Sequence, residues 1–261
     1  MTSNYDAFAL EEDGRIENQV KNEYRELNLS NPPKFIWANS SAQARDIIGS
    51  EEEIDMIICM YNEQDKEIFP FASRLKDEGR GIPFILLIHY SKAVRQRVLE
   101  SPHPGVDFVF SWHGNADLIL AIVKLLEDAA NAENDVFEVG VKGILLVEDS
   151  IRYYSNYLPE LYKIVLTQSR EFLTESLNDD QKKYRKRSRP KIFLATCLEE
   201  AIAYFEKYRR NLLGVISDVG MVFHKGDDPK TEKLDAGIDL VRIIREYDPL
   251  MPVLLQSSQG S

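Results

Sequence analysis

The feature that most constrains the fold of this chain is an order of strand, helix and strand that occurs twice. Residues 191–218 read KIFLATCLEEAIAYFEKYRRNLLGVISD, where a short apolar run leads into apolar residues at helical spacing and then into a second apolar run. Residues 34–60, KFIWANSSAQARDIIGSEEEIDMIICM, follow the same order. A hydrophobic period that changes from 2 to 3.6 and back is typical of βαβ units with a parallel sheet. The sequence therefore predicts two α/β domains.

The same patterns predict further elements on either side of these segments. In the first copy, strands are expected at residues 35–38, 54–60, 84–88 and 106–112. Helices are expected around residues 16–27, 42–48, 68–76, 92–99 and 116–130. In the second copy, strands are expected at 144–147, 192–195, 212–216 and 253–256, and helices from 151, from 198 and around 238–246.

An acidic and polar stretch at 133–142 separates the two copies. It predicts a linker between a first domain at 1–132 and a second at 143–261. The fold class that follows is α/β, with two tandem doubly wound parallel sheets of the flavodoxin-like order, which has five strands. The first copy shows strands two to five and the second shows strands one to four. Each sheet is therefore expected to be incomplete at a chain end, as in a truncated chain or gene model.

Composition and charge exclude several classes of protein. The chain is 44% hydrophobic and 29% charged, which is typical of a folded soluble protein. No apolar run approaches the ~20 residues that span a bilayer, and the N-terminus resembles no secretory signal. Cys59 and Cys197 both lie in apolar runs, as in proteins of reducing compartments. With 43 acidic and 32 basic residues, the chain is a poor general nucleic-acid binder. We expect a cytoplasmic protein that binds neither membrane nor nucleic acid.

Acidic side chains follow the strands of the second copy. Glu148 and Asp149 come after its first strand, Asp218 ends its third, and Ser257 follows its fourth. Ligands of doubly wound sheets sit outside the carboxyl ends of the strands, so these side chains should converge. A cluster of like charges is unfavourable unless a cation neutralises it, and oxygen ligands suit Mg²⁺. A carboxylate beside Mg²⁺ can attack a phosphoryl donor. The alternative is that these residues are ordinary polar loop residues.

With these residues in place, the segment from Gly143 to Ser261 resembles a response-regulator receiver domain. The resemblance implies that Asp218 accepts a phosphoryl group from a phosphohistidine donor or a small acyl phosphate. It implies that Asp149, Asp218 and the backbone carbonyl of Gly220 hold Mg²⁺ with help from Glu148, and that Ser257 turns toward the phosphoryl oxygens. Glu148 replaces the commoner Asp. The family's lysine after strand five lies beyond the end of this chain, so slow or unstable phosphorylation is expected.

The first copy resembles a pseudo-receiver that has lost this chemistry. Its third strand ends in Met60, where Asp218 stands in the second copy. Ile88 or His89 takes the place of Ser257, and Trp112, followed by His113, stands at the lysine position. Asp65, in the loop after Met60, is the one alternative phosphoacceptor there.

The whole arrangement is similar to the N-terminal regulatory region of bacterial phosphoenolpyruvate synthase-like proteins, which carry a PEP/pyruvate-binding domain. That resemblance implies phosphorelay signalling that regulates a downstream effector in cis, with any catalytic domain outside this chain. A histidine kinase or phosphotransfer protein would be the donor, and a homodimer is possible. The rival hypothesis is an unphosphorylated scaffold for interaction or dimerisation built on receiver folds. A third hypothesis is an enzyme that acts on its own.

Two further segments keep more than one interpretation. The basic tract QKKYRKRSRPK, residues 181–191, is either a solvated helix end or a docking surface for an acidic partner or a phosphate-bearing ligand. The insertion HKGDDPKTEKLDA, residues 224–236, is a loop that could also form a lid or a partner contact. Other catalytic motifs are missing: the four histidines lack metal-ligand spacing, and the sequence contains no C-x-x-C, phosphate-binding glycine loop or G-x-S-x-G.

Overall fold

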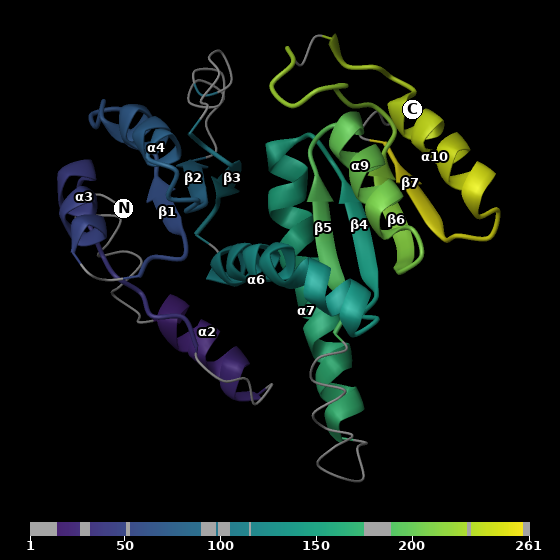
Figure 1. The fold of residues 1–261 in the computed structure, drawn as a ribbon, viewed down its shortest axis with the longest axis horizontal. Helices are drawn as coiled ribbons and strands as arrows, with labels where there is room; N and C mark the ends of the chain where they lie inside the picture. The colour runs from purple at the N-terminus through teal and green to yellow at the C-terminus, as the bar shows by residue number, and fades with distance from the viewer. Residues whose placement is uncertain are drawn as a thin grey trace. The chain divides into compact units, whose positions relative to one another are not determined.

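Two parallel sheets form the framework of the chain, each in its own part (Figure 1). The computed structural model describes residues 15–26, 32–50, 53–89, 98, 105–114, 116–174, 189–228 and 231–257. Residue contacts divide the chain into two compact units, Met1–Ile119 and Leu120–Ser261. The predicted α/β class with parallel sheets is confirmed. The division falls within helix α6 (Ala116–Glu133), ahead of the predicted linker at 133–142.

The first unit contains a three-stranded parallel sheet in the order β1-β2-β3. Its strands are β1 (Ile57–Met60), β2 (Phe84–His89) and β3 (Phe108–Trp112). The central strand β2 is buried from Phe84 to Ile88 because it has a neighbour on each side and is covered on both faces. A continuous apolar run is what such a strand requires, and the predicted strands at 54–60, 84–88 and 106–112 are therefore confirmed with small shifts in their ends.

Three helices of the first unit follow the predicted pattern. They are α2 (Arg15–Glu26), α3 (Ser41–Gly49) and α4 (Ile68–Asp77). Ile16, Val20 and Tyr24 form the buried stripe of α2. At the start of α3 the Ser40 hydroxyl accepts a hydrogen bond from the backbone N–H of Gln43 at 3.2 Å, which satisfies one of the free donors of the first turn. Of the helix predicted at 92–99, only Val98 is described, and it is helical and buried.

The strand predicted at residues 35–38 is wrong. The described residues 32–38 form neither a strand nor a bridge to β1. The rings of Phe35 and Trp37 stack on each other with centroids 6.4 Å apart, while Ile36 is 37% exposed. The alternation of apolar residues therefore reflects one packed side of this segment and not pairing with a neighbouring strand.

The second unit contains a four-stranded parallel sheet in the order β5-β4-β6-β7. Its strands are β4 (Gly143–Val147), β5 (Lys191–Ala195), β6 (Leu212–Asp218) and β7 (Val253–Gln256), and all four match predicted strands. The register pairs Val147 with Ser217 and Asp218 with Gln256. The carboxyl ends of β4, β6 and β7 therefore lie level with one another.

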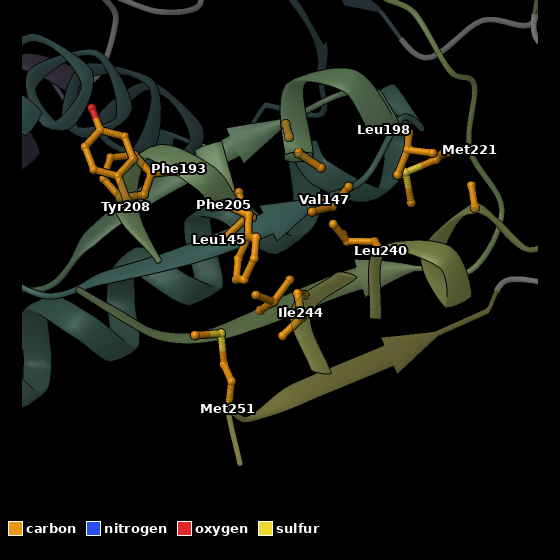
Figure 2. Packing of buried hydrophobic residues seen from close by; sticks show 14 of the residues in the cluster. Leu145, Val147, Phe193, Leu198, Phe205, Tyr208, Met221, Leu240, Ile244 and Met251 are labelled. Carbon is orange, nitrogen blue, oxygen red and sulfur yellow. The ribbon is translucent and has the colours of Figure 1, made fainter. Parts of the chain in front are cut away.

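Helices cover this second sheet on both faces (Figure 1). They are α7 (Ile151–Thr174), α9 (Leu198–Tyr208) and α10 (Ala236–Tyr247). Leu145 and Val147 pack against α9 and α10, where Phe193 stacks on Tyr208 with ring centroids 4.5 Å apart (Figure 2). The intervening residue Leu146 is equally buried and faces the opposite side of the sheet. None of the described helices is both long and apolar enough to cross a membrane.

The segment predicted as a linker contributes to the core of the second unit. Residues Asn134–Glu138 form a π-helical turn that continues α6. Val136 in this turn is 1% exposed and belongs to the core cluster beneath α9 and α10, and the ring of Phe137 stacks on Tyr208 at 5.6 Å. The polar composition of residues 133–142 gave no indication of these two apolar contacts, which fix the end of α6 to the second unit.

A buried carboxylate holds α6, α7 and β5 together. Asp128 on α6 is fully buried and accepts hydrogen bonds from the Tyr162 hydroxyl at 2.9 Å and the Ile192 backbone N–H at 3.0 Å. The Arg189 guanidinium donates to both of its oxygens, and the Lys191 ammonium lies 3.5 Å away. Arg189 and Lys191 belong to the predicted basic tract, whose residues 181–188 lie outside the described residues. At least these two basic side chains therefore have a structural role, because they pair with the buried Asp128.

Replacing Asp128 should destabilise the second unit strongly. In Asp128→Asn the buried Arg189 and Lys191 would lose their shared anion, and we expect a loss of ~3–5 kcal/mol in the free energy of unfolding. Urea unfolding of the full chain, followed by far-ultraviolet circular dichroism, measures this loss.

The matched control is Glu133→Gln on the same helix. Glu133 also pairs with a lysine, Lys207, at 2.6 Å, but its side chain is 74% exposed, so we expect little or no loss of stability because solvent screens the pair. Equal losses in the two variants would contradict a role for Asp128 as a buried anchor.

Candidate metal centre

Three carboxyl groups meet at the carboxyl edge of the second sheet. Glu148 and Asp149 directly follow β4, and Asp218 is the last residue of β6. Because Val147 is level with Ser217, the sheet register brings the three side chains together. One carboxylate oxygen from each lies within 4.8 Å of the others. The predicted convergence of these three residues is present in the structure.

Glu148 is the most deeply buried member of this cluster. It is 1% exposed, and its oxygens accept hydrogen bonds from the Ser150 backbone N–H at 3.1 Å and the Gln256 side-chain amide at 3.4 Å. Burial raises the pKa of Glu148 to about 8, with further increases from the negative charges of Asp218 and Asp149. The two hydrogen bonds oppose this shift but do not cancel it, because neither donor carries a charge.

Asp149 and Asp218 are each held by a backbone amide. The Val222 N–H donates to Asp149 at 3.2 Å, and the Val219 N–H donates to Asp218 at 2.7 Å. Burial raises the pKa of Asp149 to about 6, and the charges of Glu232 and Asp218 add to that shift. Burial also raises the pKa of Asp218 above its usual range, against the N–H groups of Val219 and Gly220.

The electrostatics of the cluster favour a bound cation. All three carboxyl groups have raised pKa values, because burial disfavours their charged forms and no described residue compensates it with a positive charge. Carboxylate oxygens in such an arrangement are the ligands that Mg²⁺ and Ca²⁺ take in proteins. The donor set therefore fits the predicted Mg²⁺, which Glu148, Asp149 and Asp218 would hold. The predicted contribution of the Gly220 carbonyl stays a prediction.

Ser257 occupies the predicted position at the end of the fourth strand. It follows Gln256, the register partner of Asp218, and its side chain is exposed. It thus lies one residue beyond the level of the cluster, at the surface. Its role as a hydroxyl that responds to phosphorylation stays a prediction.

Two residues near the cluster were not predicted from the sequence. Gln256 donates its amide to Glu148, and Glu232 acts on Asp149 through its charge. The level ends of β6 and β7 could have indicated Gln256, since it is the last residue of a strand beside Asp218. Glu232 follows Asp218 by fourteen positions within the insertion 224–236, and no local pattern marks it.

The first unit has no comparable cluster among its described residues. Met60 at the end of β1 and Ile88 in β2 are buried apolar side chains, and Trp112 pairs in register with His89. Both carboxylate oxygens of Asp65 accept hydrogen bonds, one from α3 and one from its own loop. Asp65 accepts hydrogen bonds from the Ser41 hydroxyl at 2.9 Å and the Glu67 backbone N–H at 3.0 Å, contacts that hold the loop before α4.

Comparisons with known proteins do not identify a relative of this chain. Neither protein-family models nor curated proteins nor solved structures give a match to the chain. The functional argument therefore depends on the residues of the site itself.

The cation-free protein should lose stability as the pH rises toward 8. Unfolded carboxyl groups lose their protons near pH ~4, whereas Glu148 and Asp149 keep theirs to about 8 and about 6 when folded. The folded chain binds more protons across this range, so the free energy of unfolding falls as the pH rises. Because Mg²⁺ competes with these protons, its stabilising effect should grow with pH. Melting temperatures with and without Mg²⁺ at about pH 5 and about pH 8 test this expectation.

The variant Glu148→Gln provides the control, because it removes the carboxyl group whose pKa burial raises to about 8. Its cation-free melting temperature should depend less on pH than that of the natural chain. A stabilisation by Mg²⁺ that is the same at both pH values would contradict this account of the cluster.

Proposed function

We propose that the second unit is a receiver-type phosphoacceptor, in which Asp218 takes a phosphoryl group in the presence of Mg²⁺. The observation that carries the proposal is the convergence of Glu148, Asp149 and Asp218 within 4.8 Å at the ends of adjacent parallel strands. Such a site binds a divalent cation and presents one carboxylate beside it, which is the requirement for phosphoryl transfer to an aspartate.

The order of the strands supports a flavodoxin-like assignment for both units. Counted along the second unit, the order β5-β4-β6-β7 is 2-1-3-4, which agrees with the first four strands of the flavodoxin-like order 2-1-3-4-5. The order β1-β2-β3 of the first unit agrees with strands three, four and five of the same series. We propose a tandem arrangement in which the first unit is a pseudo-receiver.

The chain's own groups prepare Asp218 for the transfer. The Val219 N–H holds one Asp218 oxygen at 2.7 Å, and the Val222 N–H fixes Asp149 beside it. In the reaction, an Asp218 oxygen forms a bond to phosphorus while the bond from phosphorus to the donor's leaving group breaks. Mg²⁺, when bound, supplies positive charge that offsets the carboxylates and the oxygens of the transferred group.

The proposal includes a signalling role for the chain. A histidine kinase or phosphotransfer protein would supply the phosphoryl group, and a downstream effector would respond to it. That effector is proposed to be a phosphoenolpyruvate synthase-like enzyme in cis, following the resemblance of the sequence. The first unit, with Met60 where Asp218 stands in the second, would take no phosphoryl group.

Incubation of the full chain with acetyl phosphate and Mg²⁺ tests the proposal. We expect intact mass spectrometry to show the addition of one phosphoryl group, and we expect a chelator of Mg²⁺ to abolish it. Beryllofluoride provides a second probe, because it mimics an acyl phosphate without hydrolysis and its binding can be followed by fluorine NMR.

Two variants decide which carboxylate reacts. Asp218→Asn should lose all modification and all beryllofluoride binding, whereas Asp65→Asn should retain both, because Asp65 belongs to a loop of the first unit. If the natural chain and Asp218→Asn behave alike with both probes, the second unit is an unphosphorylated scaffold.

A further inference from the structure

The insertion after β6 returns to the acidic cluster. Met221 and Lys233 form an antiparallel bridge in which each backbone N–H donates to the other's carbonyl, at 3.2 and 3.0 Å. This bridge brings residues 231–235, here called the return arm, alongside the segment that follows Asp218. The Ala236 N–H then donates to the Lys233 carbonyl at 3.2 Å and leads the arm directly into α10.

Glu232 is the residue of the return arm that faces the site. A Cβ atom built on Gly220 would lie 2.1 Å from Glu232 Oε1, so this carboxylate rests against the Gly220 backbone. Gly220 is two residues after Asp218, and its N–H is among the groups that act on Asp218. The absence of a side chain at Gly220 therefore leaves the space that the Glu232 carboxylate uses.

The position of Glu232 places a fourth negative charge beside the cluster. Its charge acts on Asp149, whose carboxylate is held by the Val222 N–H. Val222 lies next to Met221 of the bridge, so the backbone that binds Asp149 and the backbone that holds the return arm are the same segment. A movement of the return arm would therefore shift Met221 and Val222, and with them the hydrogen bond that holds the Asp149 carboxylate.

We infer that Glu232 couples divalent-cation binding at the cluster to the order of the return arm. The inference rests on the proposed function, because it requires a cation at Glu148, Asp149 and Asp218. Without a cation, the negative charge of Glu232 acts against that of Asp149, and the bridge between Met221 and Lys233 has to form against that repulsion. With a cation, two positive charges offset part of the negative charge of the cluster, so the repulsion on Glu232 falls and the bridge is stabilised.

Through this coupling, cation binding at the cluster would change the structure of the neighbouring protein surface. The arm carries Leu234, which is 65% exposed, and Lys233 pairs with Asp239 on α10. Ordering of the arm would therefore change the surface beside the site whenever the cation binds. Glu232 is a positioning residue in this scheme, because it acts through the loop and not on the reacting atoms.

Amide hydrogen exchange on the full chain, with and without Mg²⁺, tests the inference. In the natural chain we expect saturating Mg²⁺ to slow exchange at the amides of Met221 and Lys233. In Glu232→Gln we expect these amides to be better protected than in the natural chain when Mg²⁺ is absent, because the repulsion is gone. Mg²⁺ should then add little protection, and its affinity should fall about 10-fold, as for loss of an outer ligand group.

Two controls separate failure of the inference from failure of the proposed function. Glu246→Gln removes an exposed charge on α10 and should behave as the natural chain does in every measurement. Mg²⁺ binding with equal affinity and equal protection of the arm in the natural chain and in Glu232→Gln would overturn the inference and leave the proposed function standing. Failure of the natural chain to bind Mg²⁺ by calorimetry would overturn both.

Discussion

The register between two neighbouring parallel strands is the constraint on which the candidate site depends. Val147 is level with Ser217, so the next residue of each segment, Glu148 after β4 and Asp218 at the end of β6, places its carboxylate beside the other. The start of α10 reinforces this alignment, because the Gly237 N–H donates to the Val219 carbonyl at 2.8 Å. A Cβ at Gly237 would lie 2.2 Å from the Asp218 carbonyl oxygen, so this approach requires glycine. The helix and the end of β6 are thereby fixed as one unit.

The second unit contains two sets of buried acidic groups that differ in their compensation. Asp128 is surrounded by the Arg189 guanidinium, the Lys191 ammonium and two neutral donors, so its negative charge is balanced within the fold. The cluster at Glu148, Asp149 and Asp218 has hydrogen-bond donors that carry no charge. Asp128 is thus paired with basic side chains, whereas the described residues provide no such partner for the three carboxylates of the cluster. That contrast supports the proposal that the cluster binds an external cation, whereas Asp128 has a structural role.

The sequence was sufficient where a segment's own pattern determines its structure. The strands of the second sheet are short apolar runs, and the carboxylates that follow them could be placed because parallel strands end at a common edge. It was insufficient where the structure of a segment depends on another part of the chain that packs against it. Residues 35–38 have the alternation of a strand but no neighbour in the described sheet, and the polar stretch 133–142 hides the buried Val136. Glu232 reaches the cluster only because the chain returns through the bridge at Met221, a contact that leaves no local signal.

The central claim is that Glu148, Asp149 and Asp218 surround one cation position. The most direct measurement is an anomalous difference map from crystals of the full chain grown with Mn²⁺, which takes the same oxygen ligands as Mg²⁺. The account predicts one strong peak bonded to carboxylate oxygens of this cluster. A saturating Mn²⁺ concentration that leaves no peak there, with the three side chains turned away from one another, would contradict it.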